Sequence, residues 1–153
     1  IGFSGVVHRL ERVANICGVS CINDSKATNV DSVWYALQSV PPPIILIAGG
    51  KDKGGDFTRL KDLVQKNVKA LILIGEAEEK IKSALGDVVT VYHSDSLEEA
   101  VELSYQKAAS KDTVLLSPGC ASFDMFRDYQ HRGQVFKSSV RNLSPQHNAT
   151  IFF

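Results

Sequence analysis

Short apolar runs alternate with amphipathic stretches along most of the chain. The apolar or β-branched runs predict six strands, over residues 12–16, 19–23, 44–48, 70–74, 88–92 and 113–116. Runs that are apolar throughout, such as residues 44–48, are typical of strands that are buried on both faces of a parallel sheet. Between the runs, apolar residues recur at helical spacing. This spacing predicts helices over residues 30–40, 57–64, 76–85, 96–108 and 123–143.

The order of these elements predicts the fold class. From residue 19 onward strands alternate with helices, and each connection is long enough to cross the sheet as a βαβ unit. Cys17 and Gly18 suit a tight turn, which makes the first strand antiparallel to the second. We predict an α/β, Rossmann-like fold: a mostly parallel sheet of about six strands, with helices on both faces and an antiparallel first strand. The domain covers residues 1–143, and the tail 144–153, which lacks periodicity, stays unassigned.

Three polar loops follow predicted parallel strands, over residues 22–29, 49–56 and 116–123. In open α/β sheets, ligands bind in the crevice outside the carboxyl ends of the strands. We therefore expect the three loops to lie together on one edge of the sheet. Hydroxyl groups, lysines and glycines are frequent in them, which indicates a site for small anionic ligands.

The first loop carries an anion and a cation, Asp24 and Lys26, together with hydroxyl and amide groups. A polar turn in which Thr28 or Asn29 caps the following helix explains the same residues. This loop alone therefore does not distinguish a ligand site from an ordinary turn.

The second loop contains four glycines, which let the backbone approach a ligand closely. Lys51 and Lys53 offer cations for a carboxylate or a phosphate. The loop is not a P-loop, because the GxxxxGK[ST] pattern is absent. A flexible turn with solvated lysines is the alternative interpretation.

The third loop is predicted to open the last helix at Phe123. Free N–H groups at a helix N-terminus favour an anion, and Ser122 either donates its hydroxyl to that anion or caps the helix. Cys120 is interpreted as a small buried residue rather than a nucleophile, since no histidine is close to it in the sequence.

Two His–Arg pairs lie outside the three loops. Arg9, which follows His8, offers a planar donor that suits a phosphate, but a surface charge explains it equally well. The second pair, His131 and Arg132, falls within the last predicted helix, and we expect both residues on its solvated face.

Composition narrows the class of protein. A chain of 153 residues that is 44% hydrophobic suits one domain with a substantial core. Lys+Arg 17 balances Asp+Glu 17, and no apolar run approaches the roughly 20 residues of a membrane span, so we expect no nucleic-acid or membrane partner. Three cysteines without a CxxC pair indicate a reducing compartment, the cytoplasm, and no metal site. Because the chain begins at Ile1 and its one methionine is Met125, we expect a piece of a longer protein.

Taken together, the motifs resemble the C-terminal domain of the Mur ligases from about residue 3 to residue 143. The matching pieces are His8-Arg9, residues 23–29 (NDSKATN), residues 49–57, residues 117–124, and Phe126 with Arg132-Gly133. The NDSKATN loop is the most specific of them and is similar to members that add D-glutamate to UDP-N-acetylmuramoyl-L-alanine. Lys51 and Gly119 depart from residues common in the family.

The resemblance implies a place in a three-domain ligase. The family reaction uses ATP to phosphorylate the alanyl carboxylate, and the amine of D-glutamate then attacks the acyl phosphate. The third domain, which this chain resembles, brings in the amino acid and closes over ATP. No P-loop occurs in the sequence. The chain is therefore expected to be inactive alone, to bind ATP and Mg²⁺ weakly, and to meet UDP-N-acetylmuramoyl-L-alanine and ATP through domains outside it.

The same resemblance implies roles for individual residues, none of them a metal ligand. The side chains that would surround D-glutamate are Thr28, Lys53, Ser122, Phe123 and Tyr129. Those that would face the nucleotide or the reacting phosphate are Arg9, Asp24 and Lys26, with Arg9 and Lys26 as the catalytic pair. The competing hypothesis is a free-standing α/β module that binds a nucleotide or small anion, because fold alone does not identify function.

Overall fold

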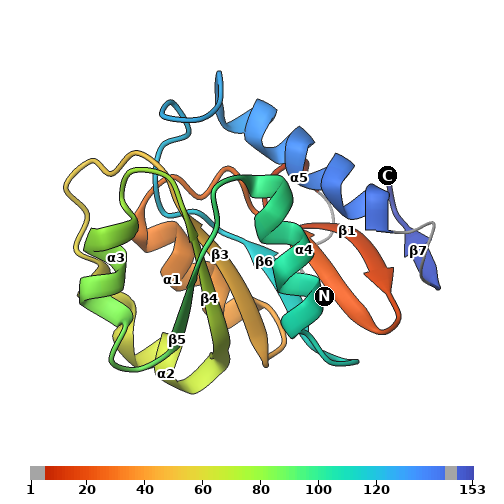
Figure 1. Cartoon of the computed structure of the whole chain (residues 1–153), viewed down its shortest axis with the longest axis horizontal. Coiled ribbons are helices and arrows are strands. Elements are labelled where there is room, and N and C mark those ends of the chain that lie inside the picture. Colours follow the sequence, from red (N-terminus) through yellow and green to blue (C-terminus); the bar gives the residue numbers. More distant parts are fainter. Residues whose placement is uncertain (1–5, 144–147) are drawn as a thin grey trace.

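The computed structural model describes residues 6–143 and 148–153. The strands are β1 (Glu11–Ile16), β2 (Val19–Asn23), β3 (Ile44–Gly49), β4 (Val68–Ile74), β5 (Thr90–His93), β6 (Thr113–Leu116) and β7 (Ala149–Ile151). They form a seven-stranded sheet in the order β5-β4-β3-β6-β2-β1-β7. The strands from β5 across to β2 are parallel, and β1 pairs antiparallel with both β2 and β7 (Figure 1). The predicted α/β class and the antiparallel first strand are confirmed.

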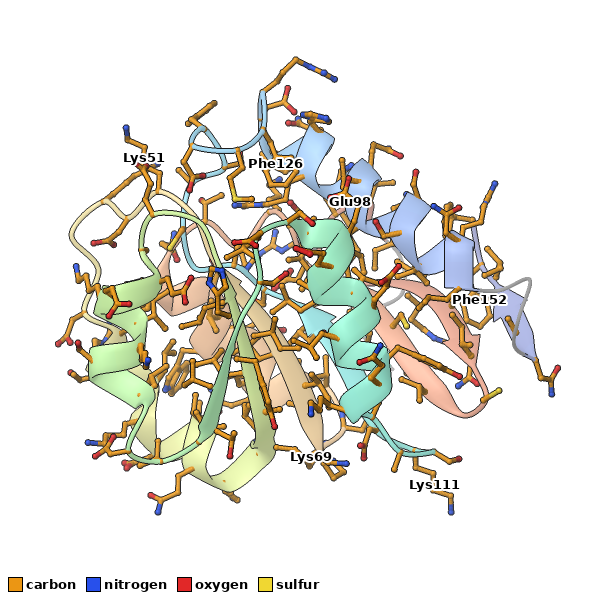
Figure 2. The ribbon with its side chains drawn as sticks, viewed as in Figure 1. Lys51, Lys69, Glu98, Lys111, Phe126 and Phe152 are labelled. Atoms are coloured by element: carbon orange, nitrogen blue, oxygen red, sulfur yellow. The ribbon has the colours of Figure 1, made fainter. Side chains whose placement is uncertain are left out.

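A strand that the sequence did not predict closes one edge of this sheet. β7 pairs with β1 through Ala14 opposite Ile151. The backbone N–H of Phe152 then donates to the carbonyl of Val13 at 2.8 Å, and the Phe152 ring lies under the Arg12 guanidinium at this end of the molecule (Figure 2). The described part of the tail therefore belongs to the sheet, although the division at residue 143 stays a prediction.

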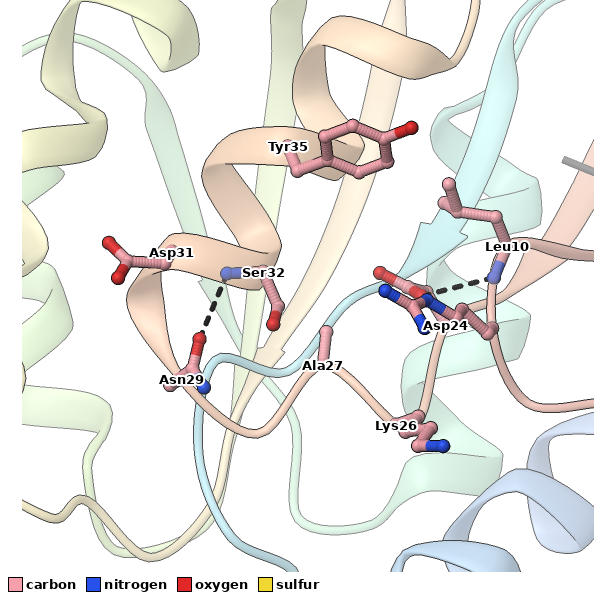
Figure 3. A pocket seen from close by; sticks show the side chains of 9 residues that line it. Leu10, Asp24, Lys26, Ala27, Asn29, Asp31, Ser32 and Tyr35 are labelled. Carbon is pink, nitrogen blue, oxygen red and sulfur yellow. Dashed lines mark hydrogen bonds between the residues drawn. The ribbon is translucent and has the colours of Figure 1, made fainter. Parts of the chain in front are cut away.

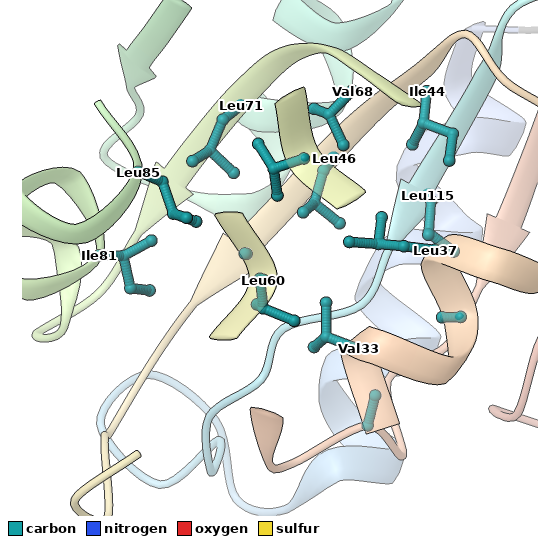
Figure 4. Close-up of a cluster of buried hydrophobic side chains, with 14 of the residues drawn as sticks. Val33, Leu37, Ile44, Leu46, Leu60, Val68, Leu71, Ile81, Leu85 and Leu115 are labelled. Carbon is teal, nitrogen blue, oxygen red and sulfur yellow. The ribbon is translucent and has the colours of Figure 1, made fainter. Parts of the chain in front are cut away.

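Helices cover both faces of the sheet. They are α1 (Val30–Ser39), α2 (Lys61–Asn67), α3 (Glu78–Leu85), α4 (Leu97–Lys107) and α5 (Tyr129–Leu143), with a 3₁₀ turn, η1 (Phe57–Leu60), ahead of α2. One apolar core lies under α1, α2 and α3, and a second lies under α4 and α5 (Figures 1 and 4). No helix in the described ranges is both long and apolar enough to cross a membrane.

The central strand β3 shows why its sequence is apolar throughout. Ile44, Leu46 and Ala48 point into the first core, whereas Ile45 and Ile47 point into the second. Successive side chains of a strand point to opposite faces, so a strand with helices on both sides needs an apolar residue at every position. Because both cores hold β3 in place, this packing also positions the start of the loop that follows β3.

The last helix begins later than predicted. Residues 123–128 form turns, and α5 starts at Tyr129. Asp128 acts as its cap: the carboxylate accepts from the backbone N–H of His131 at 2.7 Å, and its carbonyl accepts from the N–H of Arg132. Ser122 therefore caps no helix, and the expected anion site at a helix N-terminus beside it is wrong.

Candidate functional site

The three polar loops lie together on the carboxyl edge of the sheet, as predicted. Their strands β2, β6 and β3 are adjacent and parallel. Lys51 and Ala121 exchange two backbone hydrogen bonds of 2.9 Å, which joins the second loop to the third. The N–H of Gly119 donates to the carbonyl of Ala27 at 2.8 Å, which joins the third loop to the first. The loops thus form one continuous surface.

Glycines in the second loop serve this close packing. Gly49 and Gly50 have φ values of 119° and 137°, in the region that side chains disfavour. A Cβ on Gly49 would lie 2.0 Å from the carbonyl oxygen of Ile74, and one on Gly50 would lie 2.5 Å from that of Ala121. These two glycines therefore let neighbouring backbone segments approach closely.

Arg9, Asp24 and Lys26, the residues assigned to the nucleotide, line a common pocket of about 350 Å³. The other lining residues are Leu10, Ala27, Asn29, Asp31, Ser32 and Tyr35 (Figure 3). Arg9 comes from the segment ahead of β1, Asp24 and Lys26 come from the loop after β2, and α1 supplies the facing wall. Arg9 and Lys26 are both exposed. The pocket therefore places two cations beside the carboxylate of Asp24, whereas the second carboxylate of the lining, Asp31, pairs with Arg59 at 2.7 Å.

Asp24 is the buried member of this group, with 4% of its surface exposed. Its Oδ1 accepts from the N–H of Leu10 at 3.0 Å, and its Oδ2 accepts from the hydroxyl of Ser117 at 2.8 Å. Burial raises the pKa of Asp24 to about 6, although both hydrogen bonds and the charge of Arg9 act to lower it. The carboxylate thus ties the segment ahead of β1 to the loop after β6.

The five residues assigned to D-glutamate lie outside that pocket, on all three loops and α5. Ser122 is buried and Lys53 is exposed, while Phe123 has 67% of its surface exposed. Tyr129 packs edge-to-face against the His8 ring, with the ring centroids 6.1 Å apart. Thr28 is half-buried beside the true cap of α1, Asn29, whose Oδ1 accepts from the N–H of Ser32 at 2.9 Å. The arrangement leaves Thr28 available for another partner.

Arg132, which the sequence placed on a solvated face, is only 1% exposed. Its Nε donates to Ser25 Oγ at 3.0 Å and its Nη2 to the Ser25 carbonyl at 2.8 Å, while Nη1 donates to the Cys120 carbonyl at 3.0 Å. Burial lowers its pKa to about 10, so the guanidinium stays charged at neutral pH. Arg132 therefore holds the first loop to the third. Its spacing from Phe136 and Val140, on the buried face of α5, was the signal for this position.

A second buried network supports Arg9. His8 is buried, and its Nδ1 accepts from the Asn23 amide at 2.9 Å. Asn23 also donates to Glu11 at 3.0 Å, and Glu11 pairs with the buried Lys137 at 3.0 Å. Burial and the charge of Lys137 lower the pKa of His8. A neutral His8 thus acts as a structural residue that positions the start of the pocket wall.

The remaining chemical candidates are structural. Cys120 is buried, and burial raises its pKa to about 12, which agrees with the predicted small buried residue rather than a nucleophile. Within residues 6–143 and 148–153, no three His, Cys, Asp or Glu side chains cluster closely enough to hold a metal ion.

A comparison with protein families gives the family of this chain. The profile described as "Mur ligase, glutamate ligase domain" matches residues 8–120, which include the first two loops and the third as far as Cys120. The chain therefore belongs to the Mur ligase family as a glutamate ligase domain.

Its relatives include UDP-N-acetylmuramoylalanine–D-glutamate ligases. The chain is 52% identical to the one from Chloroherpeton thalassium over 143 residues, which are 94% of this chain and 31% of that protein. It is 49% identical to the one from Porphyromonas gingivalis, covering 92% of this chain and 32% of that protein. The chain thus spans about a third of the length of the curated relatives it matches.

Solved structures share the fold at low sequence identity. The UDP-N-acetylmuramate–alanine ligase MurC from Thermotoga maritima superposes with a TM-score of 0.63 and 15% identity, over 92% of this chain and 31% of that one. The MurF ligase from Thermotoga maritima, solved in complex with ADP, gives 0.60 and 14% over 94% of this chain and 33% of that one. These likenesses establish the architecture alone.

Proposed function

We propose that this chain is the amino-acid-binding domain of a cytoplasmic ligase that adds D-glutamate to UDP-N-acetylmuramoyl-L-alanine with ATP, in peptidoglycan synthesis. The observation that carries the proposal is the meeting of the three loops on one edge, with Arg9, Asp24 and Lys26 in one pocket. The 52% identity to a D-glutamate ligase supports the choice of amino acid.

The pocket suits the nucleotide side of such a site. Its volume of about 350 Å³ falls within the usual range for small-molecule sites, roughly 300–1,000 Å³. Arg9 and Lys26 provide the cations that phosphate oxygens prefer. Each oxygen of Asp24 accepts one hydrogen bond and keeps a lone pair for a ribose hydroxyl. Since the described residues offer no metal cluster, the Mg²⁺ that accompanies ATP would be held by phosphate oxygens and by groups outside this chain.

Lys53 is the cation best placed for the amino acid. It is exposed in the second loop, and its side chain has neither an ion pair nor a hydrogen bond among the described residues. D-Glutamate must keep its amine free for attack, so the site has to hold it through its carboxylates. Lys53 supplies a charge for that purpose, while Thr28 and Ser122 supply neutral hydroxyl donors.

The test is steady-state kinetics of the intact ligase with Lys53→Ala. A hydrogen bond to a charged group is worth roughly 1.5–3 kcal/mol, so the KM for D-glutamate should rise about ten- to a hundredfold. The KM for ATP should change far less. Lys51→Ala is the matched control, because Lys51 belongs to the same loop and its side chain points into solvent (Figure 2). An unchanged glutamate KM and kcat in folded Lys53→Ala, or an equal rise in the control, would refute this role.

A further inference from the structure

The exposed aromatic side chain of Tyr35 lines the proposed nucleotide pocket and does not pack in the hydrophobic core. Tyr35 lies on α1 with 60% of its surface exposed and forms part of the pocket wall. The buried face of α1 consists of other residues, Val30, Val33, Ala36 and Leu37. The core therefore does not account for the Tyr35 ring.

The lining of the pocket is divided by chemistry. Arg9, Asp24 and Lys26 supply one charged side, whereas Tyr35 stands on the α1 wall across from Leu10 and Asp24 (Figure 3). The α1 wall also carries Asp31, whose carboxylate pairs with Arg59 at 2.7 Å. Ser32 lies three residues before Tyr35, on the same side of α1, and also lines the pocket. A ligand that fits this division has an anionic end for the two cations, a polar middle for Asp24 and a flat end for the ring. A nucleotide has these three parts in that order.

We propose that Tyr35 is the platform on which the adenine base of the nucleotide stacks, so that this domain recognises the base as well as the phosphates. This inference rests on the nucleotide role proposed above for the pocket. Stacking on an aromatic side chain needs only an accessible ring face, and the exposed Tyr35 provides one.

The surface position of Tyr35 makes it a clean site for substitution. Alanine favours a helix more than tyrosine does, so Tyr35→Ala should leave α1 folded. Removal of an aromatic that stacks a base typically weakens binding by about five- to a hundredfold. Trp34→Ala is the matched control, because Trp34 is the neighbouring aromatic on α1, with 46% of its surface exposed, and does not line the pocket.

The experiment is a titration of the ¹⁵N-labelled 153-residue chain, monitored by amide chemical shifts, with ADP and separately with pyrophosphate. Wild type should respond to both compounds at the amides of Arg9 and Lys26. Tyr35→Ala should weaken ADP binding by at least about fivefold and leave pyrophosphate binding unchanged. Tyr35→Phe, which keeps the ring, and Trp34→Ala should bind ADP as the wild type does.

The possible outcomes distinguish the stacking role of Tyr35 from the nucleotide role of the pocket on which it rests. ADP affinity that is equal in wild type and Tyr35→Ala would overturn the stacking role and leave the nucleotide pocket standing. Equal weakening of ADP and pyrophosphate by Tyr35→Ala would also overturn it, because the residue would then act on the pocket as a whole. If neither compound perturbs Arg9 and Lys26 in the wild type, the nucleotide role of the pocket fails, and the Tyr35 proposal fails with it.

Discussion

Replacement of Asp24 with asparagine would test how the pocket holds a buried carboxylate. Burial raises the pKa of Asp24 to about 6, against hydrogen bonds from Ser117 and Leu10 that lower it. Asparagine has nearly the same shape and keeps an oxygen that accepts from the N–H of Leu10. The Ser117 hydroxyl, which now donates, can rotate to accept from the new amide. The substitution therefore removes the charge and leaves the contacts largely in place.

The two pKa values of Asp24 fix the sign and size of the effect. The carboxyl has a pKa of 3.8 without the fold and about 6 within it, so the folded state binds more protons between those values. The stability that this group contributes is fully present below about pH 4 and is lost as the pH rises through about 6. Above that pH, the charged form costs about 3 kcal/mol, which is the pKa difference expressed as free energy.

Urea unfolding of wild type and Asp24→Asn at a series of pH values from 4 to 8 measures this directly. The variant should be more stable by up to about 3 kcal/mol at neutral pH, and the difference should shrink towards zero near pH 4. Subtraction of the two profiles cancels the contributions of other titrating groups. Parallel profiles, or a variant that is less stable at pH 8, would refute the reasoning. The variant should also bind ADP more weakly, as expected where a functional group is held at the expense of stability.

Two further predictions concern the buried arginine and the last strand. Arg132→Met should lower the free energy of unfolding by about 2–4 kcal/mol, because the carbonyls of Ser25 and Cys120 lose their charged donor. A urea midpoint equal to wild type would contradict this expectation. Deletion of residues 148–153 removes β7 and the cation–π contact of Phe152 with Arg12, and should cost about 2–4 kcal/mol. Calorimetry checks it, and an unchanged Tm would show that the tail does not stabilise the sheet.

The local pattern of apolar residues was sufficient to predict the strands in the interior of the sheet. β6 occupies the predicted residues 113–116, and β3 extends one residue beyond the predicted 44–48. Both strands lie between helices on two faces, so almost every position in them is buried and is occupied by an apolar residue. β7 has three residues, too few to show a period, and its stability depends on pairing with β1, which is far away in the sequence. Pairing between residues that are far apart in the sequence cannot be recognised from short stretches of that sequence.

The start of α5 shows a competition that local sequence does not decide. Ser122 and Asp128 are both good helix caps. The structure uses Asp128, because the segment before it is held by tertiary contacts: the Asp124 carboxylate accepts from the N–H of Glu76 at 3.0 Å. Arg132 was misplaced for a different reason. A charge within a helix usually indicates a solvated face, whereas the hydrogen bonds of Arg132 to backbone carbonyls allow it to be buried.

The two halves of the candidate site differ in how far the sequence determines them. Arg9 and Asp24 flank the hairpin of β1 and β2, and the register that pairs Glu11 with Asn23 brings them together. Hairpin register is set locally, so the proposed nucleotide pocket follows from adjacent sequence. Lys53 and Ser122 lie on loops that meet only because β3 and β6 pair across the sheet. The proposed amino-acid side of the site therefore depends on assembly of the whole sheet. Arg132 connects the two halves by joining the first loop to the third, as do the hydrogen bonds of Ser117 with Asp24 and of Gly119 with Ala27.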